Sequence, residues 1–183
     1  MKTITVPNIL TFARILGVPL FALAYLTDHT GMAAVIFIAA IITDVLDGLI
    51  ARMKKSRTIL GSILDPLADK ILVNVALLLL AWKNPEIVQP WVVTVIISKD
   101  AILIVGWVLV YIMTSNTRVE PSIFGKLANF FESFLVIVLL LTPFFNTEPE
   151  FMKHFIHGTI IATVVIAGFA LIDYTWKGIK RFG

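Results

Sequence analysis

Cysteine is absent from this chain of 183 residues, and charged residues make up only 15% of it. The absence of cysteine excludes disulfide bonds and metal sites built on thiolates. The low charge accompanies a hydrophobic fraction of 58% and a mean hydropathy of +0.95, which lie outside the range of soluble globular proteins. These properties predict an integral membrane protein.

Long apolar segments follow one another through the chain, with only short polar connections between them. A transmembrane helix needs about 20 mainly apolar residues, and six segments meet this requirement. They cover approximately residues 8–27, 32–51, 62–82, 91–113, 123–142 and 155–176. We therefore predict an all-α integral membrane protein with six transmembrane helices, in which residues 1–183 form a single domain.

Basic residues at the helix ends and in the connections gather on one side of the predicted bundle. Lys83 and Lys153 fall on the other side. Because cytoplasmic loops are enriched in Lys and Arg, both termini and the loops 52–60 and 114–122 are predicted to be cytoplasmic. A basic rim facing anionic lipid explains the net charge of +3 without a nucleic-acid partner. The residues on the basic side are Lys2, Arg52, Lys54, Lys55, Arg57, Arg118, Lys177, Lys180 and Arg181.

Four aspartates interrupt the apolar sequence of the second and third predicted helices. Ionisable groups at membrane depth are costly and usually functional. The acids of the first pair are three residues apart and those of the second pair four apart, so each pair shares one helix face. Four carboxylates that converge from neighbouring helices suit Mg²⁺ or Mn²⁺, and their charge suits two ions. The four residues are Asp44, Asp47, Asp65 and Asp69.

Small residues and one arginine accompany these acids. Gly48, Ala51 and Gly61 leave room for a ligand to approach closely, and Arg52 offers a guanidinium suited to phosphate oxygens. Together with two metal ions they describe a diphosphate site, at which phosphoryl transfer is the natural chemistry. The plainer alternative is that the acids cap helices or pair with Lys70 or Arg52, while the glycines allow close helix packing.

The spacing of these residues resembles the signature of the CDP-alcohol phosphatidyltransferase family. That signature runs Asp-x2-Asp-Gly-x2-Ala-Arg-x8-Gly-x3-Asp-x3-Asp, and it occupies residues 44–69 here. The segment Pro7-Asn8-x2-Thr11-x2-Arg14 is similar to the opening signature of the same family. The resemblance implies transfer of a phosphatidyl group from CDP-diacylglycerol to an alcohol, with release of CMP. It also implies a homodimer.

The resemblance further implies a role for each signature residue. Asp69 is expected to act as the general base toward the acceptor hydroxyl, with Asp65 as the second catalytic carboxylate. The metal ions are expected to bind Asp44, Asp47, Asp65 and Asp69. The CDP moiety is expected to contact Asp44, Gly48, Ala51, Arg52 and Gly61.

Three basic residues inside the predicted helices are candidates for binding the acceptor: Arg14, Lys99 and Lys126. Each of them has a structural alternative. Arg14 could pair with an acid such as Asp100 or Glu132. Lys99 lies deep in the fourth predicted helix with Asp100 as a possible counter-ion, and Lys126 lies one turn into the fifth. Both lysines could form structural ion pairs or extend their ammonium toward the membrane surface.

The identity of the acceptor is less clearly indicated. Family members that use glycerol 3-phosphate typically carry Arg-Glu in the fourth helix, a second Arg two turns later, and Gly-Lys-x-Lys-Thr in the fifth. This chain has Lys99-Asp100, Trp107 and Gly125-Lys126-Leu127-Ala128-Asn129 instead. The segments 97–100 and 121–126 are at least as similar to the cardiolipin synthase branch, whose acceptor is phosphatidylglycerol.

We predict glycerol 3-phosphate as the acceptor, because it is the commonest assignment for short chains of bacterial appearance. Phosphatidylglycerol is the main alternative, and inositol phosphate and serine stay open. The predicted location is the bacterial inner membrane, with the active site on the cytoplasmic side. An alternative from another class is an intramembrane divalent-cation transporter that uses the four acids as an ion site.

Overall fold

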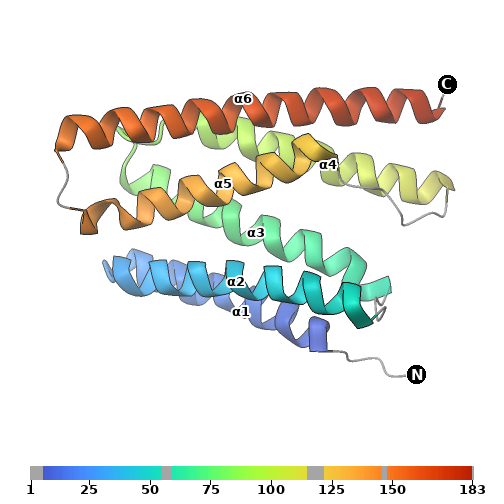
Figure 1. The fold of residues 1–183 in the computed structure, drawn as a ribbon, viewed down its shortest axis with the longest axis horizontal. Helices are drawn as coiled ribbons and strands as arrows, with labels where there is room; N and C mark the ends of the chain where they lie inside the picture. The colour runs from blue at the N-terminus through green and yellow to red at the C-terminus, as the bar shows by residue number, and fades with distance from the viewer. Residues whose placement is uncertain (1–5, 55–58, 115–121, 146–147, 183) are drawn as a thin grey trace. The chain divides into compact units, whose positions relative to one another are not determined.

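The computed structural model describes residues 6–54, 59–114, 122–145 and 148–182. Side-chain environments are described over residues 13–46, 70–106, 108, 122–145 and 148–177. Within these ranges the chain is entirely helical and contains no strand (Figure 1). The elements are α1 (Val6–Leu26), α2 (Thr30–Lys54), α3 (Ile59–Lys83), α4 (Pro90–Thr114), α5 (Ile123–Leu141), the 3-10 helix η1 (Thr142–Phe144) and α6 (Pro149–Phe182).

Each apolar segment of the sequence corresponds to one of these helices, so the all-α prediction is confirmed for the described residues. The helices extend past the predicted segments at several ends. α2 continues to Lys54 and α6 to Phe182, because the apolar pattern identifies only the part of a helix that is buried away from water. Polar and charged residues can extend the helix at its ends, where the terminal backbone groups are open to water.

The polar break between α1 and α2 ends the first helix through a local hydrogen-bonded motif. Asp28 adopts a φ of 64°, the left-handed conformation that commonly follows a helix. The N–H of His29 donates to the carbonyl of Ala24 at 2.9 Å, and the N–H of Asp28 donates to Tyr25 at 3.3 Å. Gly31, the residue best suited to a positive φ, lies in α2 instead, where an added Cβ would be 3.4 Å from the ring of Phe144.

Proline residues lie where helices begin. α4 starts at Pro90 and α6 at Pro149, and Pro7 is the second residue of α1. These are positions at which a missing N–H removes no intrahelical hydrogen bond. Pro19 lies inside α1 and removes one such bond, which transmembrane helices tolerate when neighbouring groups satisfy the carbonyl.

The chain divides into two compact units. The first comprises Met1–Leu79 with Leu140–Phe144, and the second comprises Leu80–Leu139 with Phe145–Gly183. In the first unit α1 packs against α2. In the second unit α4 packs against α6. The residues of the two units are considered separately below.

The first unit has an aromatic centre surrounded by small residues. Phe21 of α1 and Phe37 of α2 are fully buried, and their ring centroids are 5.8 Å apart. Ala24, Ala33 and Ala40 are also buried. Small side chains allow membrane helices to approach each other closely, which explains how α1 and α2 form a tight pair.

In the second unit, α6 contacts α5 in addition to α4. The rings of Phe124 and Phe169 stack with centroids 5.9 Å apart. The buried side chains include Ile96 of α4, Leu135 of α5 and Ala167 of α6. Among its described residues, this unit also buries three charged ones, Lys99, Asp100 and Glu132.

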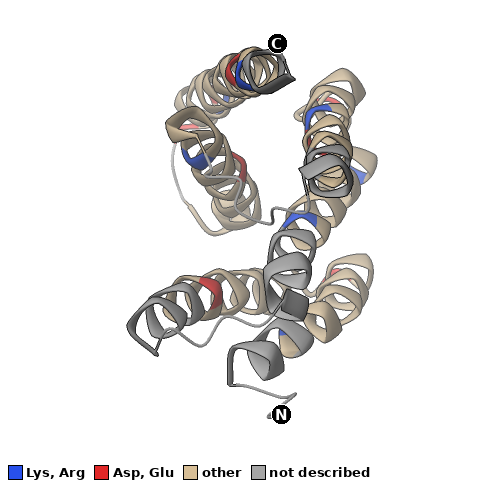
Figure 2. Cartoon of the chain, turned by 90° about the vertical axis from the view of Figure 1, so that its right-hand side faces the viewer, with Lys and Arg blue, Asp and Glu red and all other residues tan. Residues whose placement is uncertain are grey.

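Two helical segments within the described residues are long and apolar enough to cross a membrane. They are Ile123–Phe144 and Pro149–Lys177. Shorter apolar stretches occupy Ala13–Leu26 and Thr30–Leu46. Basic and acidic residues among the described ones are few and scattered along the helices (Figure 2).

Many large apolar side chains face outward from these helices. Phe130, Phe169 and Ile161 are more than half exposed, and so are Trp82 and Trp176 near helix ends. An apolar exterior of this kind is a membrane-facing or binding surface in most proteins. The exposed tryptophans agree with the aromatic residues expected at a membrane–water boundary.

Candidate active site

The four aspartates of the signature lie on two helices that are adjacent in the sequence. α2 carries Asp44 and Asp47, and α3 carries Asp65 and Asp69. Because both segments are helical, the predicted three- and four-residue spacings do place each pair on one helix face. The side chain of Asp44 belongs to the described part, whereas those of the other three acids lie outside it.

Asp44 forms an ion pair with Arg14. One guanidinium nitrogen of Arg14 lies 2.7 Å from Oδ1 of Asp44. The arginine side chain is 2% exposed and the aspartate side chain 40% exposed. The sequence suggested that Arg14 could pair with an acid, and the structure shows such a pair with Asp44. This pair joins the opening signature on α1 to the main signature on α2.

The donor chemistry of Asp44 fits a divalent cation of the Mg²⁺ type. Such ions prefer carboxylate oxygens, and this carboxylate stays accessible although Arg14 holds one of its oxygens. Among the described side chains, no group of three or more His, Asp or Glu residues is placed to bind a metal ion. The other predicted ligands, Asp47, Asp65 and Asp69, are not among those side chains.

The predicted contacts of the CDP moiety also fall mainly beyond the described side chains. Gly48, Ala51 and Arg52 lie in α2 and Gly61 in α3. Their backbone is helical, and their side-chain surroundings lie outside the described residues. Their assignment to the CDP moiety therefore stays a prediction from the signature.

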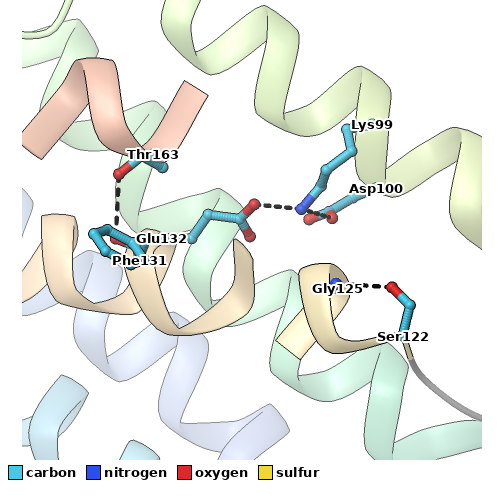
Figure 3. A network of polar contacts seen from close by, with 7 residues as sticks. All are labelled: Lys99, Asp100, Ser122, Gly125, Phe131, Glu132 and Thr163. Carbon is cyan, nitrogen blue, oxygen red and sulfur yellow. Dashed lines mark hydrogen bonds and ion pairs between the residues drawn. The ribbon is translucent and has the colours of Figure 1, made fainter. Parts of the chain in front are cut away.

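Lys99 is at the centre of a buried ionic cluster in the second unit (Figure 3). Its ammonium lies 2.8 Å from Oδ1 of Asp100 and also pairs with Oε1 of Glu132 on α5. All three residues are at most 2% exposed. The prediction that Asp100 is a counter-ion of Lys99 is confirmed.

Lys126 differs from Lys99 in its surroundings. It lies in the first turns of α5, where its N–H donates to the carbonyl of Ser122 at 3.1 Å. Its side chain is exposed, and within the described residues its ammonium forms no ion pair. Of the three predicted acceptor-binding residues, Lys126 is therefore the one with its charge available to a ligand among the described residues.

Sequence reasoning missed two partners that the fold provides. Glu132 is 33 residues from Lys99 in the chain, and Tyr174 is 52 residues from Ser122, to which its hydroxyl is hydrogen-bonded. A single acid in an apolar helix was the available signal for Glu132. Nothing in the sequence distinguishes Tyr174 from an ordinary aromatic residue near the end of a membrane helix.

The match to known proteins covers most of the chain. The family model for CDP-alcohol phosphatidyltransferase matches residues 4–172. The chain belongs to the CDP-alcohol phosphatidyltransferase family. It is thus an enzyme of phospholipid synthesis, as the signature at residues 44–69 predicted, and the alternative of a cation transporter is not supported.

Relatives within this family are named for two different reactions. A CDP-diacylglycerol–glycerol-3-phosphate 3-phosphatidyltransferase of Aquifex aeolicus is 30% identical over 96% of this chain and 96% of its own length. A cardiolipin synthase (CMP-forming) of Streptomyces coelicolor is 32% identical over 77% of this chain and 67% of its own length. The human cardiolipin synthase (CMP-forming) is 32% identical over 96% of this chain and 63% of its own length. Because the sequence identities to the two groups are similar, they do not distinguish between the two acceptors.

Proposed function

We propose that this enzyme transfers a phosphatidyl group from CDP-diacylglycerol to glycerol 3-phosphate, forming phosphatidylglycerophosphate and CMP. The observation that carries this acceptor is the exposed Lys126, whose ammonium forms no ion pair within the described residues. Such a cation suits the phosphate of a small acceptor. The Aquifex aeolicus relative, which is named for the same acceptor and matches over nearly its whole length, supports the proposal.

Phosphatidylglycerol is the second candidate acceptor, and the Lys99 cluster favours it. Two buried carboxylates already balance Lys99, so this cation is not available to a phosphate. A phosphomonoester carries about two negative charges near neutral pH, whereas the phosphodiester of phosphatidylglycerol carries one and needs fewer cations. Both acceptors present a primary hydroxyl of a glycerol that is phosphorylated at its other end.

The proposed reaction uses the signature residues of α2 and α3. The carboxylate of Asp69 takes the proton of the acceptor hydroxyl, and the hydroxyl oxygen attacks the lipid-side phosphorus of CDP-diacylglycerol. The bond from that phosphorus to the CMP oxygen breaks, and CMP leaves. A base for this step must lie within hydrogen-bonding distance of the hydroxyl. Arg52 and Gly61 are proposed to contact the CDP moiety.

Asp44, Asp47, Asp65 and Asp69 are proposed to hold two Mg²⁺ or Mn²⁺ ions. When bound, such ions offset the charge of the diphosphate and of the departing CMP. Chelation with EDTA is therefore expected to reduce CMP release to the level without enzyme, and added Mg²⁺ or Mn²⁺ is expected to restore it. Binding of Mn²⁺ to the purified protein, followed by its electron paramagnetic resonance signal, provides a measurement independent of turnover. Full activity after chelation would contradict a metal-dependent reaction.

The proposed setting is a single transmembrane domain of six helices in the bacterial inner membrane, with both termini and the active site on the cytoplasmic side. The apolar, outward-facing side chains of the described helices support a membrane location. The basic residues at the helix ends and in the connections on one side of the predicted bundle support the cytoplasmic orientation of both termini. A homodimer is proposed from the family resemblance.

A comparison of acceptors tests the proposed function. The purified enzyme is placed in phosphatidylcholine nanodiscs with CDP-diacylglycerol, and glycerol 3-phosphate or phosphatidylglycerol is supplied separately. We expect CMP release and formation of phosphatidylglycerophosphate with the first acceptor. If the only product is cardiolipin formed with phosphatidylglycerol, phosphatidylglycerol is the acceptor and the proposal of glycerol 3-phosphate is wrong. Product from inositol phosphate or serine alone would contradict both.

A further inference from the structure

The first turn of α5 is fixed by Ser122. The N–H of Gly125 donates to Oγ of Ser122 at 3.0 Å, which is the geometry of a helix N-cap. The carbonyl of Ser122 accepts the first intrahelical bond, from the N–H of Lys126 at 3.1 Å. Ser122 is 4% exposed. The backbone that carries Lys126 is thus held by a buried serine.

Tyr174 of α6 lies against this same turn. Its hydroxyl oxygen accepts a hydrogen bond from the N–H of Ser122 at 3.3 Å. A Cβ added to Gly125 would lie 2.4 Å from the hydroxyl oxygen of Tyr174 and 2.8 Å from a ring carbon. Both distances are too short for non-bonded atoms, so a Cβ at position 125 would displace the end of the Tyr174 side chain. Glycine at position 125 lets the tyrosine reach Ser122 without this displacement.

The residue before Tyr174 is itself paired within α6. The carboxylate of Asp173 lies 2.8 Å from the ammonium of Lys177. The capping residue of α5 and the tyrosine of α6 form one junction through the two hydrogen bonds of Ser122. A helix start held in this way has a defined position, whereas the long side chain of Lys126 itself is flexible.

We propose that Tyr174 is a positioning residue for the acceptor: through Ser122 and Gly125 it sets the place of Lys126 on α5. This inference rests on the proposed role of Lys126 in binding the acceptor phosphate. It explains why serine and glycine occur three residues apart just before that lysine. It also gives the last turns of α6 a part in acceptor affinity, although they contribute no signature residue.

Tyr174→Phe tests the inference, because it keeps the ring and removes the hydroxyl that accepts the Ser122 N–H. KM is measured for the acceptor at saturating CDP-diacylglycerol, and for CDP-diacylglycerol at saturating acceptor. We expect the acceptor KM to rise about three- to tenfold, the size of one lost hydrogen bond. The KM of CDP-diacylglycerol and kcat are expected to change less than about twofold.

Thr175→Ala is the matched control. The Thr175 hydroxyl lies on the neighbouring residue and donates to the carbonyl of Leu171 within α6 at 2.8 Å. Its removal is expected to leave all three kinetic constants unchanged. An unchanged acceptor KM in Tyr174→Phe would overturn the inference, and so would an equal rise in both KM values.

A second pair of variants tests the contact with Gly125 directly. Gly125→Ala is expected to raise the acceptor KM by more than Tyr174→Phe does, since the added Cβ overlaps Tyr174. In the double variant Gly125→Ala/Tyr174→Ala the overlap is gone, so the acceptor KM should be no higher than in Tyr174→Ala alone. Strictly additive effects would contradict a direct contact.

Lys126→Gln separates this inference from the proposed function. A large rise of the acceptor KM in Lys126→Gln, with no change in Tyr174→Phe, would overturn the positioning role alone. An unchanged acceptor KM in Lys126→Gln would overturn the proposed role of Lys126, and the inference with it. Thermal unfolding of each purified variant identifies any change of KM that comes from loss of folded protein.

Discussion

Asp69→Asn is expected to lower kcat by about 10²- to 10⁴-fold, the usual contribution of a general base. The amide keeps the size of the side chain and an oxygen that can bind a metal, but it cannot take the proton of the acceptor hydroxyl. Binding of CDP-diacylglycerol and of Mn²⁺ should therefore be partly retained. Single-turnover CMP release and equilibrium Mn²⁺ binding measure the two properties separately.

The other signature acids provide the comparison. Asp47→Ala and Asp65→Ala are expected to abolish turnover together with metal binding, because each removes a proposed metal ligand. If all three variants lose Mn²⁺ binding equally, Asp69 is a ligand with no separate role as base. If Asp69→Asn keeps full turnover, the base is another group.

Lys99→Met is expected to lower the free energy of unfolding by about 3–5 kcal/mol, the usual cost of removing one partner of a buried ion pair. Asp100 and Glu132 are each 1% exposed, and the ammonium of Lys99 pairs with both of them (Figure 3). In the variant each of these two buried carboxylates loses an ion-pair partner. Unfolding in mixed micelles with increasing mole fraction of sodium dodecyl sulfate measures the change.

Glu132→Gln is expected to cost much less than Lys99→Met. It leaves the ion pair of Lys99 with Asp100 in place, and the amide oxygen can still accept a hydrogen bond from Lys99. Lys153→Met is the control, since Lys153 and Glu150 form an exposed pair at 3.7 Å, and such pairs contribute less than about 1 kcal/mol. A cost for Glu132→Gln equal to that of Lys99→Met would show that the remaining pair of Lys99 with Asp100 does not stabilise the fold.

These two predictions concern different parts of the enzyme. The signature acids on α2 and α3 are proposed to perform a reaction common to relatives with different acceptors. The residues that differ in charge balance, Lys99 and Lys126, belong to α4 and α5. If Lys126 binds the acceptor as proposed, we expect a change of acceptor to involve residues of α5, while the reacting groups stay the same.

The order and approximate bounds of the helices could be predicted from the sequence. The predicted segments 91–113 and 123–142 begin within one residue of α4 and α5, whereas the last predicted segment begins at residue 155 and α6 begins at Pro149. These features are local, because apolar length, proline geometry and helical period depend on residues close in the chain. The ionic contact of Lys99 with Asp100 was predictable for the same reason.

The partners of the buried charges could not be predicted in this way. The sequence suggested an acid as a partner of Arg14, but it did not single out Asp44, with which the structure pairs it. The contact of Lys99 with Glu132 was not anticipated either. Such a contact depends on how two helices are rotated about their axes and how far they are shifted along each other. Packing of many apolar side chains decides both.

The sequence by itself indicated the reaction class, because carboxylates and glycines at fixed spacing over residues 44–69 resemble the signature of the family to which the chain belongs. It also determined the all-helical fold of the described residues, since long apolar segments have few other solutions in a membrane. Only the tertiary structure decided which cations are neutralised and which are available: Arg14 and Lys99 are paired, and Lys126 is exposed. The physical reason is that charge balance in an apolar interior is settled between helices, by side chains that packing brings together from distant parts of the chain.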